Sequence, residues 1–98
     1  MGLEYGTLKK DSRMGLDTVE LILAIEEEFH INIPDDTASR LDTAGKLYEY
    51  VLMNHKSKIK IDEEDLWKRV TQVISYQLGV RQEKIHKHDN FVYDLGAD

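Results

Sequence analysis

The chain has 98 residues, the length of one small domain, and its 41% hydrophobic and 33% charged residues are typical of a globular protein. Acidic residues outnumber basic ones and give a net charge of −6, which argues against nucleic acid as a partner and favours a basic protein. The absence of cysteine excludes disulfides and thiolate metal sites, and no apolar run approaches the about 20 residues that span a membrane.

Residues 1–15 contain three glycines and show no helical period, so we expect a flexible leader there. The clearest predicted helix covers 16–29, where the apolar side chains form a wide stripe and the acids lie mostly outside it. Asp17 or Thr18 is expected to cap its start. Pro34 cannot continue a helix, so this helix has to end before it.

Three further helical segments follow in the pattern. A single turn is expected near 36–40. A longer helix, capped by Asp42 or Thr43, should run to about residue 52. An amphipathic helix is expected over 62–78, with acids in its first turn, where they interact favourably with the helix dipole.

The stretch at 53–61 is basic and polar, and it is the best linker within the chain. Gly79 is a natural C-terminal cap of the last helix, and the 19 residues after it are expected to form an ordered loop. The anchors of this loop are Val80, Ile85, Phe91 and Leu95. The pattern predicts an all-α fold, a small bundle of three to four helices in which 16–98 form one domain.

The helices at 16–29 and 62–78 each have one apolar stripe to cover, so we expect them to pack on each other although they are distant in the chain. The residues expected in the core are Val19, Ile22, Leu23, Phe29, Ile33, Leu47, Val51, Leu66, Val70, Ile74, Leu78 and Phe91. Trp67 and Tyr76 are also assigned to the core rather than to a ligand pocket, because aromatic residues at helical spacing are usually buried.

Two blocks of the sequence resemble the acyl carrier protein family. Block 16–51 (LDTVELILAIEEEF…) resembles the second half of such a protein, from its recognition helix to its last helix. Block 65–98 (DLWKRV…YDLGAD) resembles the first half, which ends in an aspartate-leucine-glycine run before the attachment site. The halves stand in exchanged order, so the resemblance implies a circular permutant, cut at the attachment site and joined through 53–61.

The resemblance also implies a prosthetic group, 4′-phosphopantetheine, which a separate transferase esterifies to a serine at the start of the recognition helix. Such a protein carries acyl groups and is not an enzyme. In register, Gly15 occupies the position of that serine. Ser12 follows Asp11 and restores the aspartate-serine pair, but three residues then intervene before Leu16. Ser12 is the candidate attachment site, and Thr18 is a poorer one because it lies within the helix.

Carrier proteins of this family dock with basic enzymes through the recognition helix. The resemblance therefore implies acyl-processing enzymes of the fatty-acid or polyketide type, and a phosphopantetheinyl transferase, as partners. The residues assigned to partner contact are Asp17, Glu20, Glu26 and Asp98, with Glu20 and Glu26 expected to be exposed. An ordinary solvated helix surface is the alternative interpretation. We expect a cytoplasmic monomer, with a domain-swapped dimer across the 53–61 linker as the alternative.

His86 and His88 stand two residues apart, a spacing compatible with a metal pair. Neutral loop histidines are far more common than ligands, and no matching third ligand is evident from the sequence, so no metal site is expected. Two functions remain open. The chain is either a carrier loaded with a prosthetic arm or an interaction domain that has kept the carrier fold and lost the attachment serine.

Overall fold

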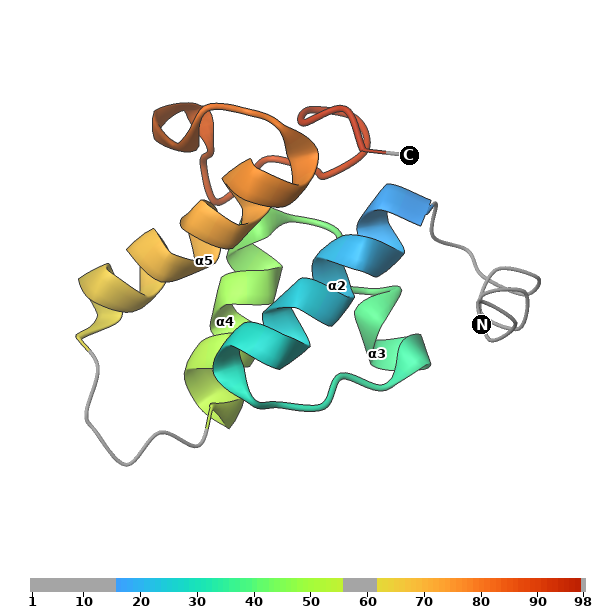
Figure 1. Ribbon diagram of the computed structural model, residues 1–98, viewed down its shortest axis with the longest axis vertical. Coiled ribbons are helices and arrows are strands. Elements are labelled where there is room, and N and C mark those ends of the chain that lie inside the picture. Colours follow the sequence, from blue (N-terminus) through green and yellow to red (C-terminus); the bar gives the residue numbers. More distant parts are fainter. Residues whose placement is uncertain (1–15, 56–61, 98) are drawn as a thin grey trace.

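The computed structural model of the chain describes residues 16–55 and 62–97 (Figure 1). Within these ranges the α-helices are α2 (Leu16–Phe29), α3 (Asp35–Ala38), α4 (Ala44–Asn54) and α5 (Glu63–Leu78), and a short 3₁₀ helix, η1 (Gln82–Lys84), follows α5. The predicted all-α bundle is confirmed over these residues. The predicted leader at 1–15, positions 56–61 of the predicted linker and Asp98 lie outside the described residues.

The helix α2 covers the range that the hydrophobic pattern predicts, 16–29. It ends because His30 takes a left-handed conformation, with φ of 56°, after which the Ile31 N–H donates to the Glu26 carbonyl at 3.2 Å. A left-handed residue directly after the last helical turn is a common way to end a helix. Pro34 then serves as the N-terminal cap of α3, so only a short extended segment separates the two helices.

The cap of α4 is Thr43, which settles the choice between Asp42 and Thr43. The Thr43 side-chain oxygen accepts a hydrogen bond from the Lys46 N–H at 3.2 Å and so satisfies one of the free amides of the first turn. The helix continues to Asn54, two residues past the predicted end at Leu52. The first two positions of the predicted linker therefore belong to α4.

The helix α5 begins with three acids, Glu63, Glu64 and Asp65, placed where the positive end of the helix dipole favours them. It ends as predicted at Gly79, which is left-handed with φ of 70° and whose N–H donates to the Ser75 carbonyl at 2.9 Å. Residues with a side chain rarely adopt this conformation, which is why a glycine is suited to the position.

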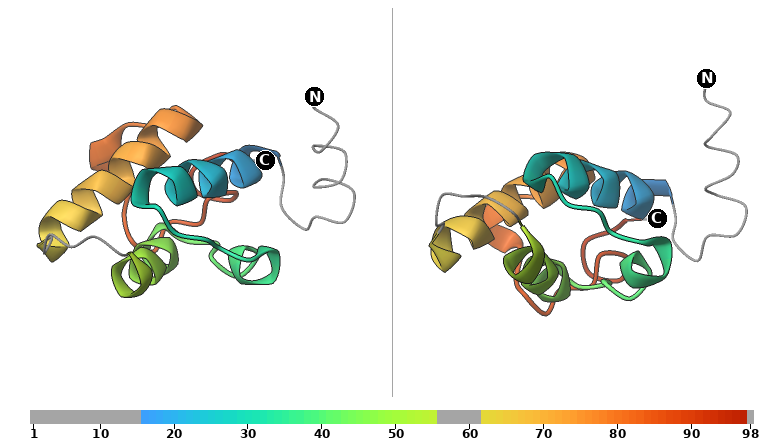
Figure 2. Two further views of the ribbon diagram at one scale, coloured as in Figure 1. Left: turned by 60° about the horizontal axis from the view of Figure 1, so that its bottom comes forward. Right: turned by 90° about the horizontal axis from the view of Figure 1, so that it is seen from below.

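The helices form two layers. Figure 2 shows α2 and α5 in one layer and α3 and α4 in the other, with the C-terminal segment running between them. The helix α5 packs against both α2 and α4, as well as against η1. The predicted contact between the helices at 16–29 and 62–78 is therefore confirmed within a single chain.

The core fills the space between the two layers. Its largest fully buried side chains are Phe91, Leu21, Ile25, Leu47, Leu66, Ile74, Val51 and Val70. Most of the predicted core is buried, namely Ile22, Phe29, Ile33, Leu47, Val51, Leu66, Val70, Ile74 and Phe91. Fully burying one such side chain stabilises the fold by about 1.5–3 kcal/mol relative to leaving it in water.

The core prediction is wrong at a few positions. Leu23 is 45% exposed, and Val19 and Leu78 are only half-buried. The helix α2 faces the core along one side only, so the row formed by Val19 and Leu23 is turned away from it. On α5, Tyr76 is 85% exposed and does not belong to the core. Trp67 is half-buried and packs against the core.

The segment after η1 is held against the start of α4. The Ala44 N–H donates to the Asp89 carbonyl at 3.0 Å, and the Gly45 N–H donates to the Lys87 carbonyl at 2.7 Å. These are free amides of the first turn of α4, which need partners from outside the helix. The anchors Ile85, Phe91 and Leu95 are buried as predicted, and Val80 is half-buried. The ordered loop expected from the sequence is thus confirmed.

Candidate functional site

The first turn of α2 is the region that the resemblance assigns to the prosthetic group. Ser12, Gly15 and Asp98 lie outside the described residues, so the structure does not place them. In every view of Figures 1 and 2, the segment up to residue 97 lies beside the start of α2. Ala97 is buried, and its N–H donates to the Phe91 carbonyl at 2.8 Å. The end of this segment is therefore anchored next to the helix start.

A hydroxyl group for attachment has to be accessible to a transferase. Thr18, in the first turn of α2, is only 6% exposed. Within the described residues, the start of α2 thus offers no exposed hydroxyl, and Thr18 does not fit a phosphopantetheine arm. Ser12, the candidate attachment residue of the sequence analysis, lies outside the described residues.

The outer face of α2 combines charge with one apolar side chain. Glu20 and Glu27 are exposed, and the exposed Leu23 lies between them at spacings of three and four residues, which places all three on one side of the helix. No Lys or Arg occurs in α2, and Asp17 adds a half-buried carboxylate near its start. We call the side chains of Glu20, Leu23 and Glu27 the acidic face.

Glu26 differs from the expectation that it is exposed. It is half-buried, and its Oε2 accepts a hydrogen bond from the Ile33 N–H at 2.6 Å. This contact ties the last turn of α2 to the extended segment that follows. Glu28 is also engaged, because its Oε2 pairs with Arg69 of α5 at 2.8 Å. The prediction of an exposed Glu26 is wrong because a buried N–H after the helix needed an acceptor.

Next to the acidic face, an open groove of about 370 Å³ lies between α2 and α5. Its lining includes Glu27 and Glu28 from α2 and Arg69 and Tyr76 from α5. Because Arg69 already pairs with Glu28, this lining is electrostatically mixed. The groove therefore continues the acidic face without adding a region of uniform charge.

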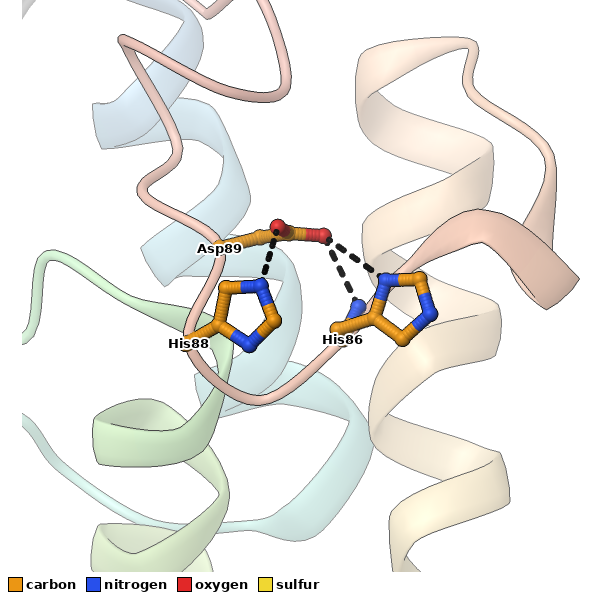
Figure 3. Close-up of side chains that lie close together, drawn as sticks. All are labelled: His86, His88 and Asp89. Atoms are coloured by element: carbon orange, nitrogen blue, oxygen red, sulfur yellow. Dashed lines mark hydrogen bonds and ion pairs between the residues drawn. The ribbon is translucent and has the colours of Figure 1, made fainter.

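A second polar group lies on the loop after η1, where His86, His88 and Asp89 come together (Figure 3). His86 Nδ1 is 3.6 Å from Asp89 Oδ2, and His88 Nε2 is 3.6 Å from Asp89 Oδ1. The His86 backbone N–H also donates to Asp89 Oδ2 at 2.8 Å. The sequence pattern indicated no ligand cluster around the two histidines, and the fold places the Asp89 carboxylate between them.

Lys87 lies between these histidines in the sequence but makes contacts with other elements. Its Nζ is 4.8 Å from the centre of the Tyr48 ring and 5.4 Å from that of Trp67, and the two rings meet edge to face. Cation–π contacts of this kind stabilise by about 0.5–1 kcal/mol at exposed sites. Burial raises the pKa of Tyr48, and the nearby carboxylates of Glu63 and Asp62 raise it further.

The described residues form a small helical bundle in which α2 is acidic. Comparison of the sequence with known proteins finds one that is locally similar. Over 39 residues the chain is 54% identical to the mitochondrial acyl carrier protein of Saccharomyces cerevisiae. The match covers 40% of this chain and 31% of the yeast protein, so it spans about a third of that relative's length. No protein-family model and no solved structure matches the chain.

This local similarity agrees with the family resemblance of the sequence. The yeast protein is an acyl carrier protein by name. Among the described helices, none is long and apolar enough to cross a membrane.

Proposed function

We propose that this chain is a carrier domain of the acyl carrier protein type, which presents acyl intermediates to fatty-acid or polyketide-type enzymes. The observation that carries the proposal is the 54% identity over 39 residues to a mitochondrial acyl carrier protein. The all-α bundle and the acidic face on α2 support it. Because the yeast relative is mitochondrial by name, a mitochondrial location is favoured over the cytoplasmic one expected from the sequence.

The permuted order of the two halves is part of the proposal. Two features of the fold support it. The helix α2 packs on α5, which follows it by more than thirty residues, and the segment 95–97 lies beside the first turn of α2. In a carrier of ordinary order, that segment would lead directly into this helix. Because α2 and α5 pack within one chain, a monomer is favoured over a domain-swapped dimer.

The acidic face is the proposed docking surface for basic enzymes. Glu20 and Glu27 supply exposed charge, Leu23 supplies an apolar contact, and Asp17 extends the charge toward the helix start. Asp98 remains a proposed contact on the strength of the family resemblance. Glu26 is half-buried and bonded to the Ile33 N–H, so it adds negative charge to this surface without contacting the partner enzyme directly.

Reversing two charges of the acidic face is expected to slow association with a basic partner. In Glu20→Lys combined with Glu27→Lys, the association rate with a phosphopantetheinyl transferase should fall about tenfold at low salt, because exposed charges act mainly on encounter. The dissociation rate should change little. Surface plasmon resonance at several salt concentrations measures both rates, and the difference should fade as salt screens the charges.

The matched control reverses two exposed acids away from α2, Glu49 of α4 and Glu83 of η1, and so makes the same change in net charge. It should leave the association rate near that of the unchanged chain. An equal loss in both double variants would show that net charge alone matters and that α2 is an ordinary solvated surface.

The proposed attachment site of the phosphopantetheine arm is Ser12. Incubation with a phosphopantetheinyl transferase and coenzyme A should add the mass of one phosphopantetheinyl group to the chain, and Ser12→Ala should abolish the addition. Intact-protein mass spectrometry measures both results. The adduct supports the carrier function directly, because the thiol of the arm is what holds an acyl group.

The alternative function is an interaction domain without the arm, favoured by Gly15 at the position of the family's serine. In that case the unchanged chain stays unmodified, and a Gly15→Ser variant is the test of whether the site can be regained. An unmodified chain that still binds the transferase through its acidic face would support this alternative over the loaded carrier.

A further inference from the structure

We propose that His86, His88 and Asp89 form a binding site for a divalent transition metal of the zinc type. The site lies on the loop after η1, on residues that the carrier proposal does not use. Each residue offers one ligand atom, and all three atoms lie within 4.8 Å of one another. Figure 3 shows both imidazole rings directed toward the same carboxylate.

The distances are close to those of a coordinated ion. Zinc binds nitrogen and oxygen at about 2.0–2.2 Å in tetrahedral geometry, which places neighbouring ligand atoms about 3.3–3.5 Å apart. The two nitrogen–oxygen separations here are both 3.6 Å but reach different oxygens of Asp89. One ligand atom from each residue can be chosen so that all three lie within 4.8 Å, so the ligands have to move closer together when the ion binds. Because the histidine side chains are 64% and 83% exposed, they can rotate inward by the small amount required without displacing packed atoms.

The carboxylate is the fixed element of the site. The Asp89 side chain is only 12% exposed, and its Oδ2 accepts the His86 backbone N–H at 2.8 Å. The Asp89 N–H donates to the His86 carbonyl at 3.0 Å, which closes a tight turn between them. A turn held in this way keeps both histidines on the same side of the aspartate.

The rest of the fold holds this turn in position. The carbonyls of Lys87 and Asp89 accept hydrogen bonds from the first turn of α4, and the Lys87 side chain lies against Tyr48 and Trp67. The Lys87 ammonium group therefore lies over these two rings and not among His86, His88 and Asp89. A preorganised loop reduces the cost of ordering the ligands when the ion binds.

The ligand set selects the class of metal. Two imidazole nitrogens and one carboxylate suit zinc, copper or nickel, whereas calcium and magnesium prefer oxygen ligands alone. Three protein ligands leave a fourth position for water or for a group from a bound partner.

Isothermal titration calorimetry with zinc chloride on the full chain tests the proposal. We expect one zinc ion per chain, and about a tenfold or greater loss of affinity in each of His86→Gln, His88→Gln and Asp89→Asn. Asparagine keeps an oxygen for the His86 N–H but loses the charge. The matched controls are His30→Asn and His55→Gln, which change the other two histidines and should bind zinc like the unchanged chain.

Nuclear magnetic resonance adds a readout that does not depend on folding stability. On addition of zinc, the imidazole protons of His86 and His88 should shift, and those of His30 and His55 should not. Since His86 and His88 are exposed, their glutamine variants should keep the helical circular dichroism spectrum. The proposal is overturned by the absence of saturable zinc binding, by variants that bind as tightly as the unchanged chain, or by one zinc shared between two chains.

Discussion

Replacing Phe91 with alanine is expected to lower the free energy of unfolding by about 3–5 kcal/mol, the usual cost of truncating a core aromatic residue. Phe91 is 1% exposed and heads the fully buried side chains of the core. Its N–H donates to the Asp42 carbonyl at 3.0 Å, and its carbonyl accepts from Ala97. Truncation therefore leaves a cavity and weakens the attachment of the segment that reaches the start of α2.

Urea denaturation followed by circular dichroism measures the change. A domain of this size has a total stability of about 5–15 kcal/mol, so the variant should be close to unfolding at 25 °C. The control is Tyr93→Ala, two residues away and 86% exposed, which should change stability by less than about 0.5 kcal/mol. Equal stability of the Phe91 variant and the unchanged chain would contradict the packing described above.

Replacing Gly45 with alanine is expected to destabilise the chain by about 1–3 kcal/mol, as overpacking in a well-packed site does. A methyl group at this position would lie 2.8 Å from the Lys87 carbonyl oxygen and 3.0 Å from the Lys87 Cβ. The Gly45 N–H donates to the same carbonyl at 2.7 Å, so the loop cannot move away without losing that bond. This strain outweighs the gain of about 1 kcal/mol that alanine normally brings to a helix.

Thermal unfolding measures the loss of stability, and hydrogen exchange should show faster exchange of the Gly45 amide. Glu49→Ala on the same helix is the control, since Glu49 is exposed and its replacement should be nearly neutral. A Gly45→Ala chain that melts above the unchanged one would show that the loop is free to retreat. It would also mean that the loop carrying His86, His88 and Asp89 is not rigid.

The helices, and the C-terminal ends of α2 and α5, are predictable from the sequence because their signals are local, whereas the end of α4 was predicted two residues too early. The range 16–29, the stop before Pro34 and the glycine cap at Gly79 follow from periodicity and from the conformations that proline and glycine allow. The same signals do not say which side of a helix faces inward when apolar residues surround most of it. In α2, Leu21 and Ile25 are fully buried and Leu23 is exposed, although all three are aliphatic.

The polar contacts were harder to predict because they depend on residues brought together by folding. In the sequence, nothing distinguishes Glu26 from the other acids of α2. Its contact with the Ile33 N–H forms only because the chain turns back after the helix. Asp89 stands directly after His88, but its carboxylate reaches His86 as well only because the loop forms a turn. No periodicity in the sequence marks either contact, since each is set by a single local bend.

The packing of α5 against both α2 and α4 has a consequence for the order in which the chain is made. Chains leave the ribosome from the N-terminus, so α2, α3 and α4 emerge before the helix that covers their apolar sides. Phe91, which fills the space between the layers, follows later still. Until residues 63–97 are synthesised, the earlier helices expose the side chains of the future core to water. During translation these side chains are open to contact with other chains, which favours aggregation of the incomplete domain.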